Sequence, residues 1–134
     1  MLVENPSDSG KIIKVFSVVP SHTGGFDAEL YRASWDGSNT SLDTYNLNGK
    51  YSDATSLNAE QGTSVIDTGS ATRLPPSILS PSGTGTEKGA PPISSDVAYT
   101  LDEGDVLGVR VTPEATSELN VSVILAEYEE DREF

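Results

Sequence analysis

The sequence predicts an all-β fold, an antiparallel β-sandwich of about seven or eight strands, of which a jelly roll is one arrangement. Three observations lead to this prediction. Apolar and polar residues alternate in short runs of β-branched and aromatic residues, turn-forming residues recur between these runs at close spacing, and no stretch carries the i, i+3, i+4, i+7 apolar stripe of a surface helix. The 134 residues are enough for one hydrophobic core, so we expect a single domain over residues 1–134.

The first third of the chain predicts a pair of strands. Residues 11–19 (KIIKVFSVV) are rich in β-branched and aromatic types, and Pro20 after them favours a turn that SHTGG continues. In residues 26–35 (FDAELYRASW), every second side chain from Phe26 to Leu30 is apolar, as in a strand with one buried face. We expect the two runs to form a hairpin.

The middle of the chain gives weaker signals. Residues 36–40 (DGSNT) have the composition of a turn, because glycine and asparagine tolerate a left-handed backbone. Residues 41–47 and 63–67 are candidate strands, and a polar stretch separates them. The pattern does not give the order of these strands.

Two segments are candidate assembly arms. Residues 73–95 contain five of the chain's eight prolines, a density that argues against regular structure. A loop of this length is either a flexible insertion or an arm that packs on a neighbouring subunit. Residues 1–10 are the second candidate, with a short apolar hook ahead of the turn-forming NPSDSG. The candidate assembly residues are Leu2, Val3, Pro75, Pro76, Ile78 and Leu79.

The last third has the clearest pattern. Residues 97–101, 106–112 and 119–128 are predicted strands, and DEGD at 102–105 is a predicted turn. In the last two runs, alternate residues give each strand a single apolar face. Two consecutive runs of this kind predict a hairpin against a common core.

Acidic residues outnumber basic ones by 21 to 8, and the formal net charge is -13. We therefore expect no nucleic-acid partner, because phosphate contacts need a basic face. A disordered acidic protein does not fit a chain that is 35% hydrophobic in patterned runs. A cationic partner and a surface adapted to high salt remain, and we favour high salt, where repulsion between surface charges is screened.

The chain has no cysteine, so disulfides and thiolate metal sites are excluded. Its unbroken apolar runs reach only four residues, as in VILA at 123–126, which is too short for a membrane-spanning helix. The first residues lack the cationic start and the long apolar core of a signal peptide. We expect neither a membrane partner nor export by a signal peptide.

The sequence predicts no catalytic, cofactor-binding or metal-binding residue. The one histidine, His22, lies in a predicted turn, and no motif places a nucleophile and a carboxylate beside it. DGSNT and DEGD lack the spacing of a calcium loop, and GTGTEKG at 83–89 lacks the ending of a phosphate loop. We interpret the many acids as surface charge rather than as the paired acids of a glycosidase. We expect no enzyme and no cofactor.

Aromatic rings that stack on sugar faces would indicate glycan binding. Tyr31 and Trp35 share a face of one predicted strand and are the candidate residues for such a platform. Packing in the core or against another subunit is the interpretation that we favour for both.

Five stretches of the sequence carry a resemblance to known proteins: ENPSDSGKIIKVFSVVPS, FDAELYR, LDTYNLNGKYSDA, YTLDEGDVLGVRVTP and LNVSVILAEYEE. In these stretches the chain resembles small all-β proteins encoded among the virion structural genes of tailed viruses of bacteria and haloarchaea. Asp8 stands where the common outline has a small residue, and residues 73–95 have no counterpart in it. The resemblance implies a head-associated or tail-associated protein that binds other virion proteins, and it carries over no catalytic residue.

These observations together predict a non-enzymatic virion structural protein of a virus with a halophilic host. We expect a capsid decoration or turret-like component that forms a homo-oligomer, a trimer or a pentamer, and binds a major capsid protein or another virion protein. Its place would be the virus particle, after assembly in the host cytoplasm. The alternative is a tail or fibre module that binds host surface glycans through Tyr31 and Trp35.

Overall fold

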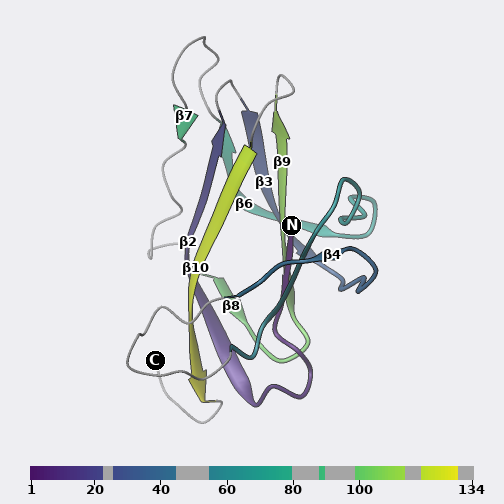
Figure 1. Cartoon of the computed structure of the whole chain (residues 1–134), viewed down its shortest axis with the longest axis vertical. Helices are drawn as coiled ribbons and strands as arrows, with labels where there is room; N and C mark the ends of the chain where they lie inside the picture. The colour runs from purple at the N-terminus through teal and green to yellow at the C-terminus, as the bar shows by residue number, and fades with distance from the viewer. Residues whose placement is uncertain (23–25, 45–54, 80–87, 90–98, 114–118, 130–134) are drawn as a thin grey trace.

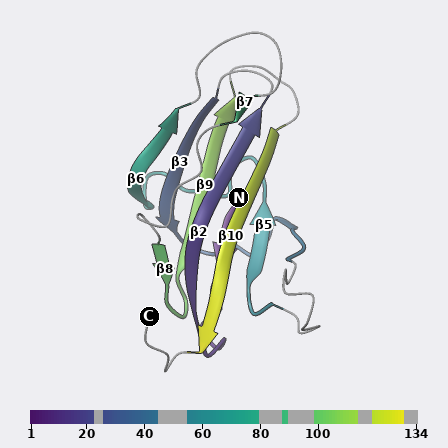
Figure 2. The same ribbon diagram turned by 90° about the vertical axis from the view of Figure 1, so that its left-hand side faces the viewer.

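A computed structural model describes residues 1–22, 26–44, 55–79, 88–89, 99–113 and 119–129. These residues form ten strands and no helix. The strands make two antiparallel sheets that lie face to face, which Figure 1 and Figure 2 show from two directions. The predicted antiparallel β-sandwich is confirmed, with more strands than the sequence suggests.

The first sheet has six strands. In spatial order they are β4 (Thr40–Ser41), β5 (Asn58–Gln61), β1 (Leu2–Glu4), β9 (Val106–Pro113), β3 (Phe26–Ala33) and β6 (Thr72–Leu79). The second sheet has four strands, with β2 at its centre. They are β10 (Leu119–Glu129), β2 (Lys11–His22), β7 (Lys88–Gly89) and β8 (Tyr99–Leu101).

The core lies between the two sheets and takes side chains from both. On β3, Phe26, Ala28 and Leu30 are at most 2% exposed, so the predicted alternation correctly identifies the buried face of this strand. The second sheet contributes buried residues of β2 and β8. The main core cluster consists of Val3, Ile13, Val15, Val18, Phe26, Ala28, Leu30, Leu57, Ala59, Leu101, Leu107 and Val109.

Both predicted hairpins are wrong. β2 lies in the second sheet and β3 in the first, and β9 and β10 are divided in the same way. β10 pairs along its whole length with β2, and β3 pairs along its whole length with β9. An apolar face shows which side of a strand is buried, but the partner strand can lie beside it or across the core.

Pro20 does not end the second strand. β2 continues to His22, so this histidine is a strand residue rather than a turn residue, and Pro20 pairs with Val121 of β10. On its other side β2 pairs with β8 at residues 13–15 and with β7 at residues 21–22. A proline fits a strand where its missing N–H is not needed by a neighbour.

The middle of the chain departs from the predictions. Residues 63–67 do not form a strand, and residues 58–61 do. Of the predicted strand at 41–47, only Ser41 lies in a strand, and residues 45–47 lie outside the described part of the chain. The polar sequence of β5 gives no periodic signal, since its strand conformation comes from pairing with β1 and β4.

The prediction that residues 73–95 lack regular structure is wrong for 73–79 and 88–89, which lie in β6 and β7. Residues 80–87 and 90–95 lie outside the described residues. In β6, Leu74 faces Leu30 and Ile78 faces Ala28, so Pro75 and Pro76 fall within an irregularity of the edge strand. Edge strands and bulges are the places in a sheet that tolerate proline.

A second apolar cluster lies on the outer face of the first sheet. It joins Leu2 and Val106, whose chain neighbours Val3 and Leu107 point to the main core, with Val65. Ala33, Trp35 and Ile66 pack against it. The segment that follows β5 thus covers part of the outer face.

Candidate binding cleft

The first strand accompanies β9 over only part of its length. β1 pairs with residues 106–108 of β9, and Met1 extends the pairing by one residue. The N–H of Val109 donates to the carbonyl of Met1 at 2.8 Å, and the amino group of Met1 donates to the carbonyl of Val109 at 2.9 Å. Beyond this point β9 continues to Pro113, as Figure 1 shows beside the N mark.

Val111 therefore presents its backbone polar groups to an open edge. Along an antiparallel strand, the N–H and C=O of every second residue point to the same neighbour. Val109 turns both groups to Met1, so Val111 turns its own groups to the same side. No described strand pairs with Val111 on that side, while on the other side its register partner is Ala28 of β3.

A cleft of about 720 Å³ runs along this edge. Val65 and Ile66 form one of its walls and belong to the cluster on the outer face of the first sheet. Leu42 and Val121 form the opposite wall and pack against the main core. The cleft thus has apolar walls on both faces of the sheet, at the place where the next strand of the sheet would lie.

Below the cleft, the gap between the sheets is bridged. The carboxylate of Glu127 on β10 accepts a hydrogen bond of 2.8 Å from the N–H of Ser56, which precedes β5. This bond ties the edge of the second sheet to the first.

The cleft lining differs in charge from the chain as a whole. Although the formal net charge is -13, Arg110 is the one charged side chain among the lining residues that the structure describes. Thr63, Ser64 and Thr112 contribute hydroxyl groups, and no His, Cys, Asp or Glu is found in this described part of the lining. These groups can bind a ligand by hydrogen bonds and apolar contact.

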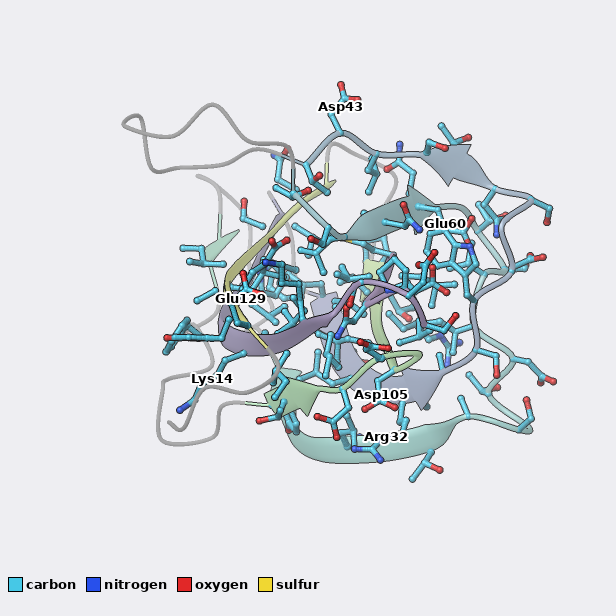
Figure 3. All side chains as sticks on the ribbon, turned by 90° about the horizontal axis from the view of Figure 1, so that it is seen from below. Lys14, Arg32, Asp43, Glu60, Asp105 and Glu129 are labelled. Carbon is cyan, nitrogen blue, oxygen red and sulfur yellow. The ribbon has the colours of Figure 1, made fainter. Side chains whose placement is uncertain are left out.

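The amino group of Met1 lies at the floor of the cleft. Burial lowers its pKa below the ordinary value of 8.0, while the nearby Glu60 acts in the opposite direction. Glu60 is itself 2% exposed, and its carboxylate accepts hydrogen bonds from the N–H groups of Gly37 at 3.2 Å and Asn39 at 3.4 Å. Figure 3 shows Glu60 among the strands, whereas Asp43 points away from the molecule.

An ionic cluster lies next to the cleft on the outer face of the first sheet. The carboxylate of Glu29 is 3.6 Å from the guanidinium of Arg110 and 3.8 Å from that of Arg73. The hydroxyl of Tyr31 donates to the same carboxylate. The guanidinium of Arg110 is thereby already paired with a carboxylate.

The proposed glycan platform is not present as an exposed surface. Tyr31 is 6% exposed, and Trp35 is half-buried against the outer cluster that contains Leu2 and Val106. β3 ends at Ala33, so Trp35 lies beyond the strand. The prediction of a shared, open ring surface is wrong, and the packing interpretation of these two residues is the one that the structure supports.

The prediction that Leu2 and Val3 form an apolar hook for a neighbouring subunit is also wrong. Leu2 and Val3 are 0% and 3% exposed, because β1 lies inside the first sheet between β5 and β9. Their side chains fill the two apolar clusters of this chain and do not face a neighbour. The other candidate assembly residues, Pro75, Pro76, Ile78 and Leu79, lie in β6 at an edge of the first sheet.

Sequence reasoning missed Asn5, which is fully buried. Its side-chain amide donates to the carbonyls of Lys11 at 2.8 Å and Leu101 at 2.9 Å, and its side-chain oxygen accepts from the hydroxyl of Ser9 at 2.6 Å. Its backbone N–H donates to the carbonyl of Asp105 at 3.0 Å. The composition of NPSDSG predicts a turn, but nothing in it separates a buried asparagine from a solvated one.

In the described ranges no group of three or more His, Cys, Asp or Glu residues could hold a metal ion. Nor does this part of the chain contain a helix long and apolar enough to cross a membrane. Comparison of the chain with protein-family models, with curated proteins and with solved structures finds no match.

Proposed function

We propose that this chain is a non-enzymatic structural protein of a virus particle, a capsid decoration or turret-like component of a virus with a halophilic host. Its partners would be further copies of itself, in a trimer or a pentamer, and a major capsid protein or another virion protein. It would join the particle during assembly in the host cytoplasm.

The cleft beside Val111 is the observation that carries this proposal. It offers an open strand edge between two apolar walls, and the lining residues that the structure describes include no reactive pair of side chains. Sites of this kind bind other chains by main-chain hydrogen bonds and apolar contact. A protein that acts by docking needs such a surface, whereas an enzyme needs a nucleophile, an acid or a base in its cleft.

The resemblance to virion proteins gains support from the position of its two most distinctive stretches. ENPSDSGK and LDEGDVLGVRV lie far apart in the sequence, and they meet in the fold. Asn5 bonds to Leu101 and Asp105, and the N–H of Gly10 donates to the carboxylate of Glu103 at 2.9 Å. Both stretches thus build the scaffold, which is consistent with relatives that share a structural role.

The distribution of charge supports a high-salt setting. The side chains of the two buried clusters are apolar, whereas Asp102 and Glu103 in the turn after β8 are exposed. Such a surface keeps a protein soluble in concentrated salt, where the repulsion between its carboxylates is screened.

The test is co-purification with particles. Virions banded in a density gradient and washed in high salt would contain this chain at a fixed ratio to the major capsid protein, measured by quantitative mass spectrometry of its peptides. Immunogold labelling would then distinguish the capsid surface from the tail. A chain that is abundant in infected cells but absent from washed particles would contradict the proposal.

A further inference from the structure

We infer that the cleft beside β9 binds an extended peptide segment, which adds a strand to the first sheet next to residues 110–113. This inference deepens the proposed function, because it names the kind of partner that an assembly protein would dock. Peptide binding by the isolated chain does not itself depend on the virion assignment.

The first step of the argument is the direction of the hydrogen-bonding groups. The paired bonds between Met1 and Val109 are those of a regular antiparallel ladder, and they place the N–H and C=O of Val111 on the same open side. An extended segment would accept from this N–H and donate to this C=O. A small apolar ligand would remove their water and leave both groups unpaired, which opposes binding.

The second step is the shape of the cleft. Side chains of a strand point alternately to the two faces of its sheet. The cleft has an apolar wall on each face, Val65 and Ile66 on the outer one and Leu42 and Val121 on the inner one. An inserted strand would therefore find apolar residues on both faces of the sheet, beside the polar groups of Thr63, Ser64 and Thr112.

The third step is size. The open part of β9 covers four residues, 110–113, which correspond to roughly 13 Å of extended chain. The volume of about 720 Å³ lies within the range of roughly 300–1,000 Å³ that is usual for ligand sites. A segment of about four residues with β-branched or other apolar side chains fits these dimensions.

The fourth step is charge. Among the lining residues that the structure describes there is no Asp or Glu, so these residues do not call for a basic partner segment in spite of the formal net charge of -13. Like charges facing each other would disfavour a segment rich in lysine or arginine next to Arg110. The occupant that the cleft favours is an uncharged or weakly acidic extended segment of another virion protein.

The experiment begins with a display library of random ten-residue peptides, selected on the full chain in about 1 M KCl. A selected peptide is then synthesised with blocked ends, and its Kd is measured by fluorescence anisotropy. Ser64→Trp places a large side chain at the rim of the cleft and is expected to weaken binding at least tenfold. Thr100→Trp, at an exposed position of β8 outside the lining, is the matched control and should leave the Kd unchanged.

A second variant tests the hydrogen bond itself. Val111→Pro removes the N–H that faces the cleft, while Val111→Ala keeps it and shortens the same side chain. We expect the proline variant to bind at least tenfold more weakly than the alanine variant. Because an open edge tolerates proline, both variants should fold, which circular dichroism checks.

Hydrogen exchange gives a readout that does not depend on any variant. In the complex, the amide of Val111 should exchange more slowly, and peptides N-methylated on one set of alternate amides should lose binding while those methylated on the other set retain it. If the library yields no peptide that binds the unaltered chain more tightly than it binds the Ser64→Trp variant, the inference is overturned. It is also overturned by binding that leaves exchange at Val111 unchanged, or by an anilinonaphthalene sulfonate probe that occupies the cleft and that no peptide displaces. Co-purification with particles is measured separately, so either proposal can fail without the other.

Discussion

The side-chain amide of Asn5 donates a hydrogen bond of 2.9 Å to the backbone carbonyl of Leu101, 96 residues further along the chain. Asn5 follows the last residue of β1 in the first sheet, and Leu101 ends β8 in the second sheet. A second bond from the same amide, to Lys11, holds the first residue of β2. One buried side chain thus joins both sheets at this end of the sandwich.

Replacing Asn5 should destabilise the fold strongly. Asn5→Ala leaves the carbonyls of Lys11 and Leu101 buried without this donor, and we expect a loss of about 2–4 kcal/mol in the free energy of unfolding. Urea titration followed by tryptophan fluorescence measures it. Asn58→Ala is the matched control, because the amide of Asn58 is exposed and, among the described residues, donates to Glu4, so its loss should cost no more than about 0.5 kcal/mol. Equal effects of the two substitutions would contradict this role of Asn5.

Replacing Tyr99 is expected not to destabilise the fold, in contrast to replacing Asn5. The Tyr99 hydroxyl is buried and has no hydrogen-bond partner among the described residues, and burial raises its pKa above 10.0. Tyr99→Phe should therefore be neutral or stabilising by about 1 kcal/mol at neutral pH. Above pH 10 the unfolded chain releases the phenolic proton while the folded chain keeps it, so the stability of the unaltered protein should fall as the pH rises.

The phenylalanine variant lacks this proton, so the difference between the two proteins should widen between about pH 9 and pH 11. Chemical denaturation at both pH values measures the difference. A gap that stays constant with pH would mean that the hydroxyl titrates in the folded protein as it does in the unfolded chain.

Gly108 lies against Ile66 and Ala33 in close packing on the outer face of the first sheet. A Cβ atom at this position would lie 2.8 Å from Cδ1 of Ile66 and 3.4 Å from Cβ of Ala33. Gly108→Ala should cost about 1–3 kcal/mol through overpacking. The double variant with Ile66→Val, which removes Cδ1, should recover part of this loss, and a double-mutant cycle from urea melts measures the coupling. If the two substitutions change the free energy of unfolding additively, Cδ1 of Ile66 is not the atom that the new Cβ contacts.

Stability should depend on salt. The formal net charge is -13, and lowering the salt from about 1 M to about 0.1 M extends the Debye length from roughly 3 Å to roughly 10 Å, so repulsion between surface carboxylates grows. We expect a lower Tm at low salt, measured by scanning calorimetry. Asp8→Asn combined with Asp43→Asn removes two exposed negative charges and should reduce the dependence. A Tm that does not change over this range would contradict adaptation to high salt.

The sequence was sufficient for the fold class and for the buried face of the regular strands. Phe26, Ala28 and Leu30 are buried as their spacing predicts, and Gly104 has a φ of 86° in the predicted DEGD turn. The sequence did not predict which strands pair. An apolar face is buried equally well whether the next strand in the chain lies beside it in the same sheet or across the core in the other sheet.

The cleft could not be predicted from periodicity. Its walls come from Leu42, the 61–66 segment, β9 and the start of β10, which meet only in the folded chain. Two buried polar residues fix turns by hydrogen bonds to backbone groups: Glu60, next to the lining residue Gln61, and Asn5, at the opposite end of β9. Hydrogen bonds of this kind produce no periodic pattern in the sequence. Glu60 lies in a polar stretch whose composition predicts an exposed position.

The central position of β1 in the first sheet has a consequence for the order of folding. Leu2 is made well before its partners, because it pairs with Glu60 on one side and with Gly108 on the other. On a ribosome, the first sheet must wait for most of the chain, and two aliphatic side chains stay exposed in the meantime. Pairings of such long sequence separation are slow, typically on the scale of milliseconds to seconds. β1 can therefore complete its pairing in the first sheet only after β9 has been synthesised. In a nascent chain that is halted before β9, β1 would have an unpaired edge that could pair with another sheet.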